Sequence, residues 1–178
     1  LDLLLDQTEF EPGFNGQRDH LILELFYGTG MRLSELLGLK IEDFQLNSRQ
    51  IKVTGKRNKQ RIIPMFDMLH EQVRSYLLER ESIQSSSRDF FLFEDGKPLY
   101  AVYVYRLVNR YLAKVSTKRK KSPHVLRHSF ATEMLNKGAD LNAIKELLGH
   151  ASLSATQVYT HNTIEKLKAA YNLAHPRA

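Results

Sequence analysis

Hydrophobic residues recur at helical spacing along most of the chain. Over residues 18–27, Leu21, Ile22, Leu25 and Phe26 are spaced for one face of a helix, and Gly28 follows as a stop signal. Similar spacing with capping residues predicts further helices over residues 35–39 (N-cap Ser34), 67–79 (cap Asp67), 100–115, 123–137 (Ser122-Pro123 at the start, Gly138 at the end), 141–148 (cap Asp140, ended by Gly149), 154–158 and 163–175 (cap Thr163). Most of the chain is therefore expected to be helical.

Two short segments show the alternation of β-strands instead. Residues 49–54 place Ile51 and Val53 on one face, and residues 60–65 are rich in residues that favour strands. The turn between them (GKRNK, residues 55–59) is basic, so the pattern predicts a β-hairpin with a cationic turn. A third short strand is predicted over residues 90–93. The expected fold class is mainly α (α+β), one helical domain with a small three-stranded antiparallel sheet.

Composition and charge narrow the possible partners. Lys and Arg number 26 against 20 Asp and Glu, a net charge of +6, which favours a polyanion such as nucleic acid. The chain has no cysteine, so disulfides, a cysteine nucleophile and thiolate metal ligands are excluded. No apolar run approaches the roughly 18 residues that a membrane span needs. We therefore expect a cytoplasmic protein with no membrane partner.

Four short clusters could carry chemistry: residues 28–32 (GTGMR), the hairpin turn 55–59, residues 124–128 (HVLRH), and residues 148–150 (LGH) followed by Tyr159. Each also has a simpler structural explanation. Arg32 could pair with Glu35, the hairpin lysines could be solvated, and His150 could interact with the dipole of a helix end. Tyr159 is one of eight tyrosines. A single cluster therefore does not identify the function of the protein.

His124 and Arg127 form the most informative pair. They lie three residues apart in the first turn of a predicted helix, so they project on the same side. The backbone N–H groups at a helix N-terminus add to the attraction for an anion. A phosphate group fits this arrangement, although an ordinary polar first turn would look the same.

Taken in order, the clusters resemble those of the tyrosine recombinases, most closely the bacterial Xer type. Residues 28–38 (GTGMRLSELLG) resemble the first-arginine box of the family, residues 54–64 (TGKRNKQRIIP) its lysine hairpin, residues 124–140 (HVLRHSFATEMLNKGAD) its His-x-x-Arg box, and residues 147–161 (LLGHASLSATQVYTH) its histidine and tyrosine box. Four such boxes in this order are specific. One departure is Glu133, where Xer proteins often have a histidine.

The resemblance implies the following catalytic set: Arg32, Lys56, His124, Arg127, His150 and the nucleophile Tyr159. Lys56 is preferred to Lys59 because it precedes Pro64 by eight residues, as the catalytic lysine of the family does. Further contacts to DNA are expected from Arg57, Lys59, Lys120 and Lys121. The resemblance also implies that residues 1–178 form the catalytic domain, with the N-terminal core-DNA-binding domain of such enzymes absent from this chain, and that protomers form a tetramer on two DNA duplexes.

The residue types suit the reaction that the family catalyses. Two guanidiniums can stabilise the negative charge that develops on the phosphate oxygens, with His150 adding a hydrogen bond. A phenol has a pKa of about 10, so Tyr159 needs a cationic pocket or a base, for which His124 is the candidate. A hairpin lysine could protonate the leaving 5′ oxygen. The expected product is a 3′-phosphotyrosine, formed without metal, ATP or other cofactor.

Two other functions remain possible from the sequence. A type IB topoisomerase would use the same chemistry and reseal the original strand. A non-catalytic DNA-binding module could use residues 122–149 as a helix-turn-helix. The last predicted helix carries an apolar stripe (Ile164, Leu167, Ala170 and Tyr171), which could dock on a neighbouring protomer or pack on its own domain.

Overall fold

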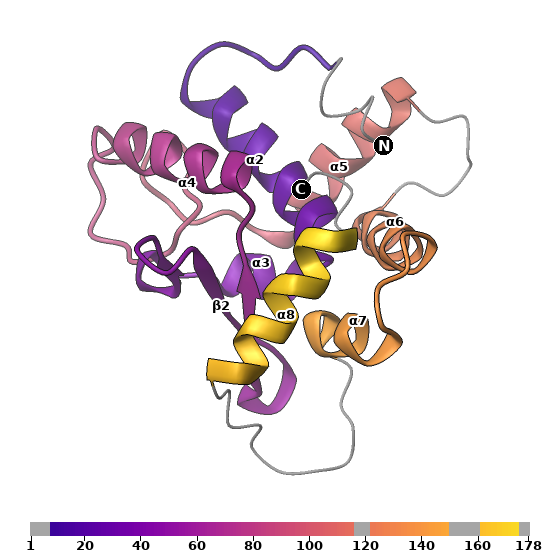
Figure 1. Cartoon of the computed structure of the whole chain (residues 1–178). Coiled ribbons are helices and arrows are strands. Elements are labelled where there is room, and N and C mark those ends of the chain that lie inside the picture. The colour runs from indigo at the N-terminus through magenta and orange to yellow at the C-terminus, as the bar shows by residue number, and fades with distance from the viewer. Residues whose placement is uncertain (1–7, 116–121, 150–160, 175–178) are drawn as a thin grey trace.

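Helices make up most of the structure, and one small antiparallel sheet lies among them (Figure 1). The computed structural model describes residues 8–115, 122–149 and 161–174. The predicted fold class is confirmed. The elements are α2 (Phe14–Thr29), α3 (Leu33–Gly38), η1 (Ile41–Asp43), β1 (Phe44–Gln45), β2 (Gln50–Thr54), η2 (Lys56–Asn58), β3 (Gln60–Pro64), α4 (Asp67–Arg80), α5 (Ala101–Val115), α6 (Pro123–Asn136), α7 (Leu141–Leu148) and α8 (His161–Ala174). The helix predicted at residues 154–158 lies outside the described residues.

Helix α2 is buried on all sides. Every residue from Leu21 to Met31 is buried, and α2 packs against α4 and α6. The helix is longer than predicted at both ends. It begins at Phe14, and Gly28 stays helical while Gly30 takes the left-handed conformation that ends it (φ 62°). The central helix thus leads directly into the segment that carries Arg32.

The predicted hairpin is confirmed. Strand β2 pairs with β3 in antiparallel register, with Ile51 opposite Ile63 and Val53 opposite Arg61. The turn between the strands is a short 3-10 segment in which Arg57 and Asn58 both have positive φ. Ile51, Val53 and Ile63 are buried, and so is Arg61, which places a cation on the core side of the sheet.

The third strand of the sheet was predicted in the wrong place. It is β1, which pairs with β2 through Phe44 and Ile51. Residues 90–93 form only an isolated bridge between Leu92 and Pro98. The backbone there is bound by side chains of α4 instead: Arg80 Nε donates to the Phe90 carbonyl at 3.0 Å, and the Leu92 N–H donates to Tyr76 Oη at 3.3 Å. The Phe90 N–H donates to Leu39 O and the Phe93 N–H to Lys97 O, so this segment bonds to loops and side chains and not to the sheet.

Two of the predicted helix starts are confirmed. Ser122 precedes α6 with Pro123 in its first turn, and Asp140 caps α7 by accepting from the N–H groups of Asn142 and Ala143. The predicted helix ends at Gly138 and Gly149 also agree with the structure, since both glycines have positive φ.

Three other predicted caps are wrong. Helix α3 begins at Leu33, so its N-cap is Arg32 and not Ser34. Helix α4 begins at Asp67 itself, whose carboxylate pairs with Arg49. Helix α8 already includes His161, so Thr163 lies inside it. In α3 the carboxylate of Glu35 accepts the Arg32 N–H at 2.7 Å, which satisfies the helix start without a serine hydroxyl.

Helix α8 packs on its own domain. It lies beside α6 and α7 in Figure 1 and also contacts β3. Leu167 and Tyr171 from the predicted stripe are buried, while Ile164 and Ala170 are half-buried. The Tyr171 hydroxyl donates to the carbonyl of Gly28 at 2.7 Å. Of the two possibilities left open for this stripe, the structure shows the intradomain one.

Candidate active site

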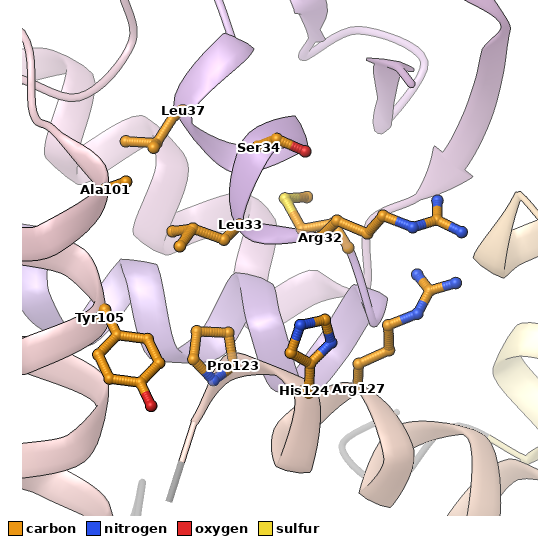
Figure 2. A pocket seen from close by; sticks show the side chains of 10 residues that line it. Arg32, Leu33, Ser34, Leu37, Ala101, Tyr105, Pro123, His124 and Arg127 are labelled. Carbon is orange, nitrogen blue, oxygen red and sulfur yellow. The ribbon is translucent and has the colours of Figure 1, made fainter. Parts of the chain in front are cut away.

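Three of the predicted catalytic residues line one cavity. Arg32, His124 and Arg127 meet at a cavity of about 370 Å³, although they come from two distant segments of the chain. Arg32 is the residue before α3, and the other two lie in the first turns of α6. In Figure 2 the two guanidiniums point to the same side, and the apolar wall of Leu37, Tyr105 and Pro123 lies on the other. The cavity therefore has a cationic edge and an apolar wall.

Gly30 allows the segment that carries Arg32 to approach α6 and α7. A Cβ atom at this position would lie 2.6 Å from Leu148 Cδ2 and 2.7 Å from Phe130 Cδ1. Its φ of 62° also disfavours any other residue. The glycine is thus required by space and by backbone conformation, and the cationic edge depends on this close approach.

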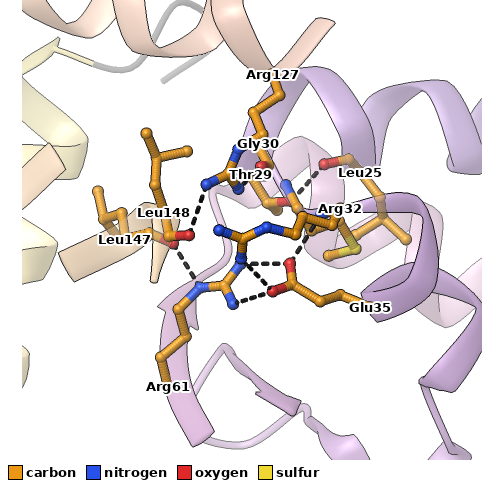
Figure 3. Close-up of polar contacts among 10 residues, drawn as sticks. Leu25, Thr29, Gly30, Arg32, Glu35, Arg61, Arg127, Leu147 and Leu148 are labelled. Atoms are coloured by element: carbon orange, nitrogen blue, oxygen red, sulfur yellow. Dashed lines mark hydrogen bonds and ion pairs between the residues drawn. The ribbon is translucent and has the colours of Figure 1, made fainter. Parts of the chain in front are cut away.

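Arg32 is oriented by a buried carboxylate. Its Nη1 donates to Glu35 Oε1 at 2.8 Å, in addition to the backbone bond at the helix start. Arg61 donates to both oxygens of the same carboxylate, each at 2.9 Å (Figure 3). Burial acts to raise the pKa of Glu35, but the hydrogen bonds and charge of Arg61, followed by the bonds from Arg32, outweigh burial and lower it. Glu35 is therefore ionised at neutral pH.

Arg127 is held by two main-chain carbonyls. Its Nη1 donates to Gly30 O at 2.5 Å and its Nη2 to Leu148 O at 2.8 Å. Burial, followed by the positive charge of Arg32, lowers its pKa to about 10, so it remains charged at neutral pH. Neither carbonyl neutralises that charge. An anion placed between Arg32 and Arg127 would relieve their repulsion and receive hydrogen bonds of fixed direction.

The predicted hairpin cations lie beside this site but not in its wall. Lys56, Arg57 and Lys59 are all exposed in the turn. The turn starts at Gly55, where a Cβ atom would lie 3.1 Å from Glu35 Oε1. The hairpin turn therefore begins next to the carboxylate that orients Arg32, and both Lys56 and Lys59 lie within this turn.

The remaining predicted residues lie outside the described residues: His150, Tyr159, Lys120 and Lys121. The approach to His150 is described, because Gly149 ends α7 with a φ of 64°. A Cβ atom on Gly149 would lie 3.0 Å from Arg61 Nη1. The segment that carries the histidine and tyrosine box thus departs from a point in contact with Arg61.

Two residues of this network were missed or underestimated from the sequence. Arg61 was not predicted at all, and Glu35 was considered only as a partner of Arg32. A signal existed in the hairpin, because Arg61 shares the inward face of its strand with Ile63. A cation on a core-facing strand position needs buried acceptors, and a carboxylate is the acceptor that also balances its charge. The sequence did not show which carboxylate this would be.

In the residues that the structure describes, no three His, Cys, Asp or Glu side chains gather where they could hold a metal ion. Within the same residues, no helix is both long and apolar enough to cross a membrane. What the site offers is two fixed guanidiniums and an imidazole around a space open to an oxyanion, an arrangement suited to a phosphoryl or similar centre.

Comparison with known proteins agrees with this arrangement. Residues 3–166 match the model of the Phage integrase family. The chain is 47% identical over 173 residues to tyrosine recombinase XerC of Chlorobaculum parvum, covering 93% of this chain and 51% of that protein. It is 41% identical over 179 residues to tyrosine recombinase XerD of Staphylococcus saprophyticus, covering 99% and 61%. The chain thus spans about half the length of the XerC relative.

Solved structures share the fold. The crystal structure of XerA recombinase matches with a TM-score of 0.72 and 33% identity, over 92% of this chain and 60% of that one. The XerH site-specific recombinase, bound to its difH substrate in a pre-cleavage complex, matches with a TM-score of 0.73 and 30% identity, over 98% and 47%. Both similarities cover nearly the whole of this chain.

Proposed function

Since the chain belongs to the Phage integrase family, we propose that it is the catalytic domain of a site-specific DNA recombinase. The enzyme cleaves and rejoins DNA strands through a 3′-phosphotyrosine at Tyr159, without a metal ion or ATP. Residues 1–178 form this domain. In the complete enzyme, we propose that a separate DNA-binding domain corresponds to the part of the relatives that this chain does not cover. The absence of cysteine suits the reducing environment of the cytoplasm, where we place the protein.

The observation that carries this proposal is the convergence of Arg32 and Arg127 on one edge of the cavity with His124. Two guanidiniums can each offer donors to the nonbridging oxygens of a DNA phosphate and remain charged throughout the reaction. Stabilisation of this kind is worth about 10² to 10³ in rate for each donor lost. The charge that a metal ion supplies in other nucleases is thus available from the protein.

In the reaction that we propose, Tyr159 attacks the phosphorus and His124 accepts the phenol proton or a hydrogen bond from it. Lys56 protonates the leaving 5′ oxygen, and His150 donates to the same phosphate oxygens as the arginines. The P–O bond to Tyr159 forms as the bond to the 5′ oxygen breaks. Attack by a 5′ hydroxyl of another duplex then releases Tyr159 and completes strand exchange, which conserves the number of phosphoester bonds.

Double-stranded DNA is the proposed partner, with further protomers in a tetramer on two duplexes. Arg57, Lys59, Lys120 and Lys121 are the proposed contacts to the DNA backbone. The net charge of +6 and the exposed hairpin cations support this role. Recombination is favoured over topoisomerase activity because the relatives are named recombinases, one of them bound to its difH substrate.

The test uses the full-length gene product and a DNA site selected by its binding from a random library. The site is placed in a nicked duplex that loses a short 5′ fragment after cleavage, so that religation is blocked. We expect a covalent protein–DNA band on a denaturing gel that persists with chelator present. The band should vanish in Tyr159→Phe and fall by at least about 10² in rate in Arg127→Ala.

Tyr105→Phe is the matched control, because Tyr105 lines the same cavity on the side opposite the two guanidiniums in Figure 2. It should leave the covalent band in place. A band lost with Tyr105→Phe but kept with Tyr159→Phe would assign the nucleophile to Tyr105. If the protein bound the selected site and gave no band at all, the non-catalytic DNA-binding function would be preferred.

A further inference from the structure

Arg61 is a buried arginine with every guanidinium nitrogen in use. It is 4% exposed, on the inward face of β3. Its Nε donates to Leu147 O at 2.6 Å, and Nη1 and Nη2 donate to the two oxygens of Glu35, each at 2.9 Å (Figure 3). Burial of a guanidinium is costly unless its charge and hydrogen bonds are satisfied in this way. A lysine would supply the charge but not three donors in one plane.

The two Nη atoms of Arg61 connect it to Arg32 through Glu35. The paired bonds from Arg61 fix the Glu35 carboxylate in one orientation, and that carboxylate accepts both the Arg32 N–H and its Nη1. Arg61 is not among the residues that line the cavity. It can therefore influence a phosphate there only through the groups that it holds in place.

The Nε atom of Arg61 connects it to the end of α7. The last carbonyls of a helix have no partner inside it. In α7, two consecutive carbonyls of this kind accept hydrogen bonds from arginines: Leu147 O from Arg61 and Leu148 O from Arg127. Gly149 follows directly, so close to Arg61 that a Cβ would lie 3.0 Å from Nη1. Arg61 thus contacts the point from which the chain continues to His150.

We propose that Arg61 is a positioning residue of the active site. It sets the direction of Arg32 through Glu35 and binds the end of α7 through its Nε, so that Arg32 and the end of α7 keep a fixed separation. The inference rests on the proposed function. It adds a residue that touches neither the DNA nor the reacting atoms and yet controls the rate.

The first experiment compares full-length wild type with Arg61→Lys on the suicide duplex. Because a misplacement of about 1 Å can cost about 10²-fold, we expect single-turnover cleavage to slow by about 10- to 100-fold at saturating protein. The Kd for the same DNA should stay within about twofold, since Arg61 is buried. Arg74→Lys, an exposed arginine on α4, should change neither quantity.

A double-mutant comparison separates positioning from a general structural role. If Arg61 acts through Arg32, Arg61→Lys should slow cleavage much less in an Arg32→Lys background than in wild type. Equal slowing in both backgrounds would overturn the proposal, and so would an unchanged rate in Arg61→Lys alone. Should Arg61→Lys fail to fold, Glu35→Asp replaces it, because it withdraws the same carboxylate by one methylene.

A second measurement does not depend on activity. In wild type, the ¹⁵N–¹H NOE of the Arg32 side-chain Nε should report an ordered guanidinium, and Arg61→Lys should lower it while the backbone values of α3 are retained. Unchanged Arg32 order would overturn the proposal. If wild type gave no covalent band but Arg32 lost order in Arg61→Lys, the proposed function would fail and the positioning role would stand.

Discussion

At the scale of single residues, Glu35 serves two arginines and a helix start at once. Its carboxylate accepts from Arg61, from the Arg32 side chain and from the Arg32 backbone. Loss of this carboxylate would leave Arg61 as an uncompensated cation in the core. The stability of the protein and the geometry of the site therefore depend on the same ionised group.

This dependence predicts how stability changes with pH. The folded state lowers the pKa of Glu35 below its ordinary value of 4.5, so its contribution is complete above pH 4.5 and is lost as the pH falls through the lowered pKa. Glu35→Gln should reduce the free energy of unfolding by about 3 kcal/mol at neutral pH, because Arg61 loses its counter-charge. The difference from wild type should shrink below pH 4.5.

Urea unfolding of both proteins over a pH series measures this difference. Glu79→Gln removes an exposed carboxylate from α4 and should change stability by less than about 0.5 kcal/mol throughout. A difference between wild type and Glu35→Gln that stayed constant into strong acid would contradict the assignment of Glu35 as the ionised partner of Arg61.

The residues that sequence analysis found and missed differ in one physical respect. Arg32, His124 and Arg127 lie in local motifs, and all three line the cavity. Arg61 has no local signature, because its role depends on a carboxylate on another element and on a carbonyl of α7. Polar pairs between residues this far apart in the sequence depend on the tertiary fold. Local sequence patterns do not show which partners the fold brings together.

At the scale of elements, the connection after α2 is fixed by one glycine. Gly30→Ala would force a Cβ into contact with Leu148 and Phe130 and would strain the left-handed backbone. We expect the free energy of unfolding to fall by at least about 2 kcal/mol, because overpacking and backbone strain both destabilise the folded state. Cleavage should also slow, because Arg32 lies two residues further along.

Gly38→Ala provides the matched control, because a Cβ there meets nothing within 4 Å. Being the last residue of α3, it should be neutral or stabilise the protein by up to about 1 kcal/mol. Thermal unfolding and the suicide-duplex rate compare the two variants. Equal behaviour of both would mean that Gly30 does not limit the approach of α2 to α6 and α7.

The same scale shows why elements were predictable to different degrees. The β2–β3 hairpin followed from alternation and a turn, both of which are local. The misplaced third strand did not, since Phe90 stacks on Phe44 with ring centroids 3.8 Å apart and its carbonyl is bound by Arg80. Aromatic packing against α4 and β1 overrode the strand pattern of residues 90–93.

At the scale of the whole molecule, α8, the last described helix, packs against the end of α2. Tyr171 is fully buried, donates to Gly28 O at the end of α2, and stacks on Phe66 with ring centroids 6.4 Å apart. Burial raises the pKa of its hydroxyl well above the ordinary value, so it stays protonated and bonded. Helix α8 thus belongs to the core that supports the connection leading to Arg32.

Tyr171→Ala should therefore destabilise the whole domain rather than release one helix. Loss of a buried aromatic ring costs about 3–5 kcal/mol, and the hydrogen bond to the Gly28 carbonyl is lost as well. Leu173→Ala, on the same helix but 73% exposed, should change stability by less than about 0.5 kcal/mol. Urea unfolding followed by circular dichroism and by amide hydrogen exchange in α2 measures both. If exchange in α2 stayed as slow as in wild type while α8 alone became exposed, α8 would be an appended helix, and its contact with Gly28 would contribute nothing to the order of the site.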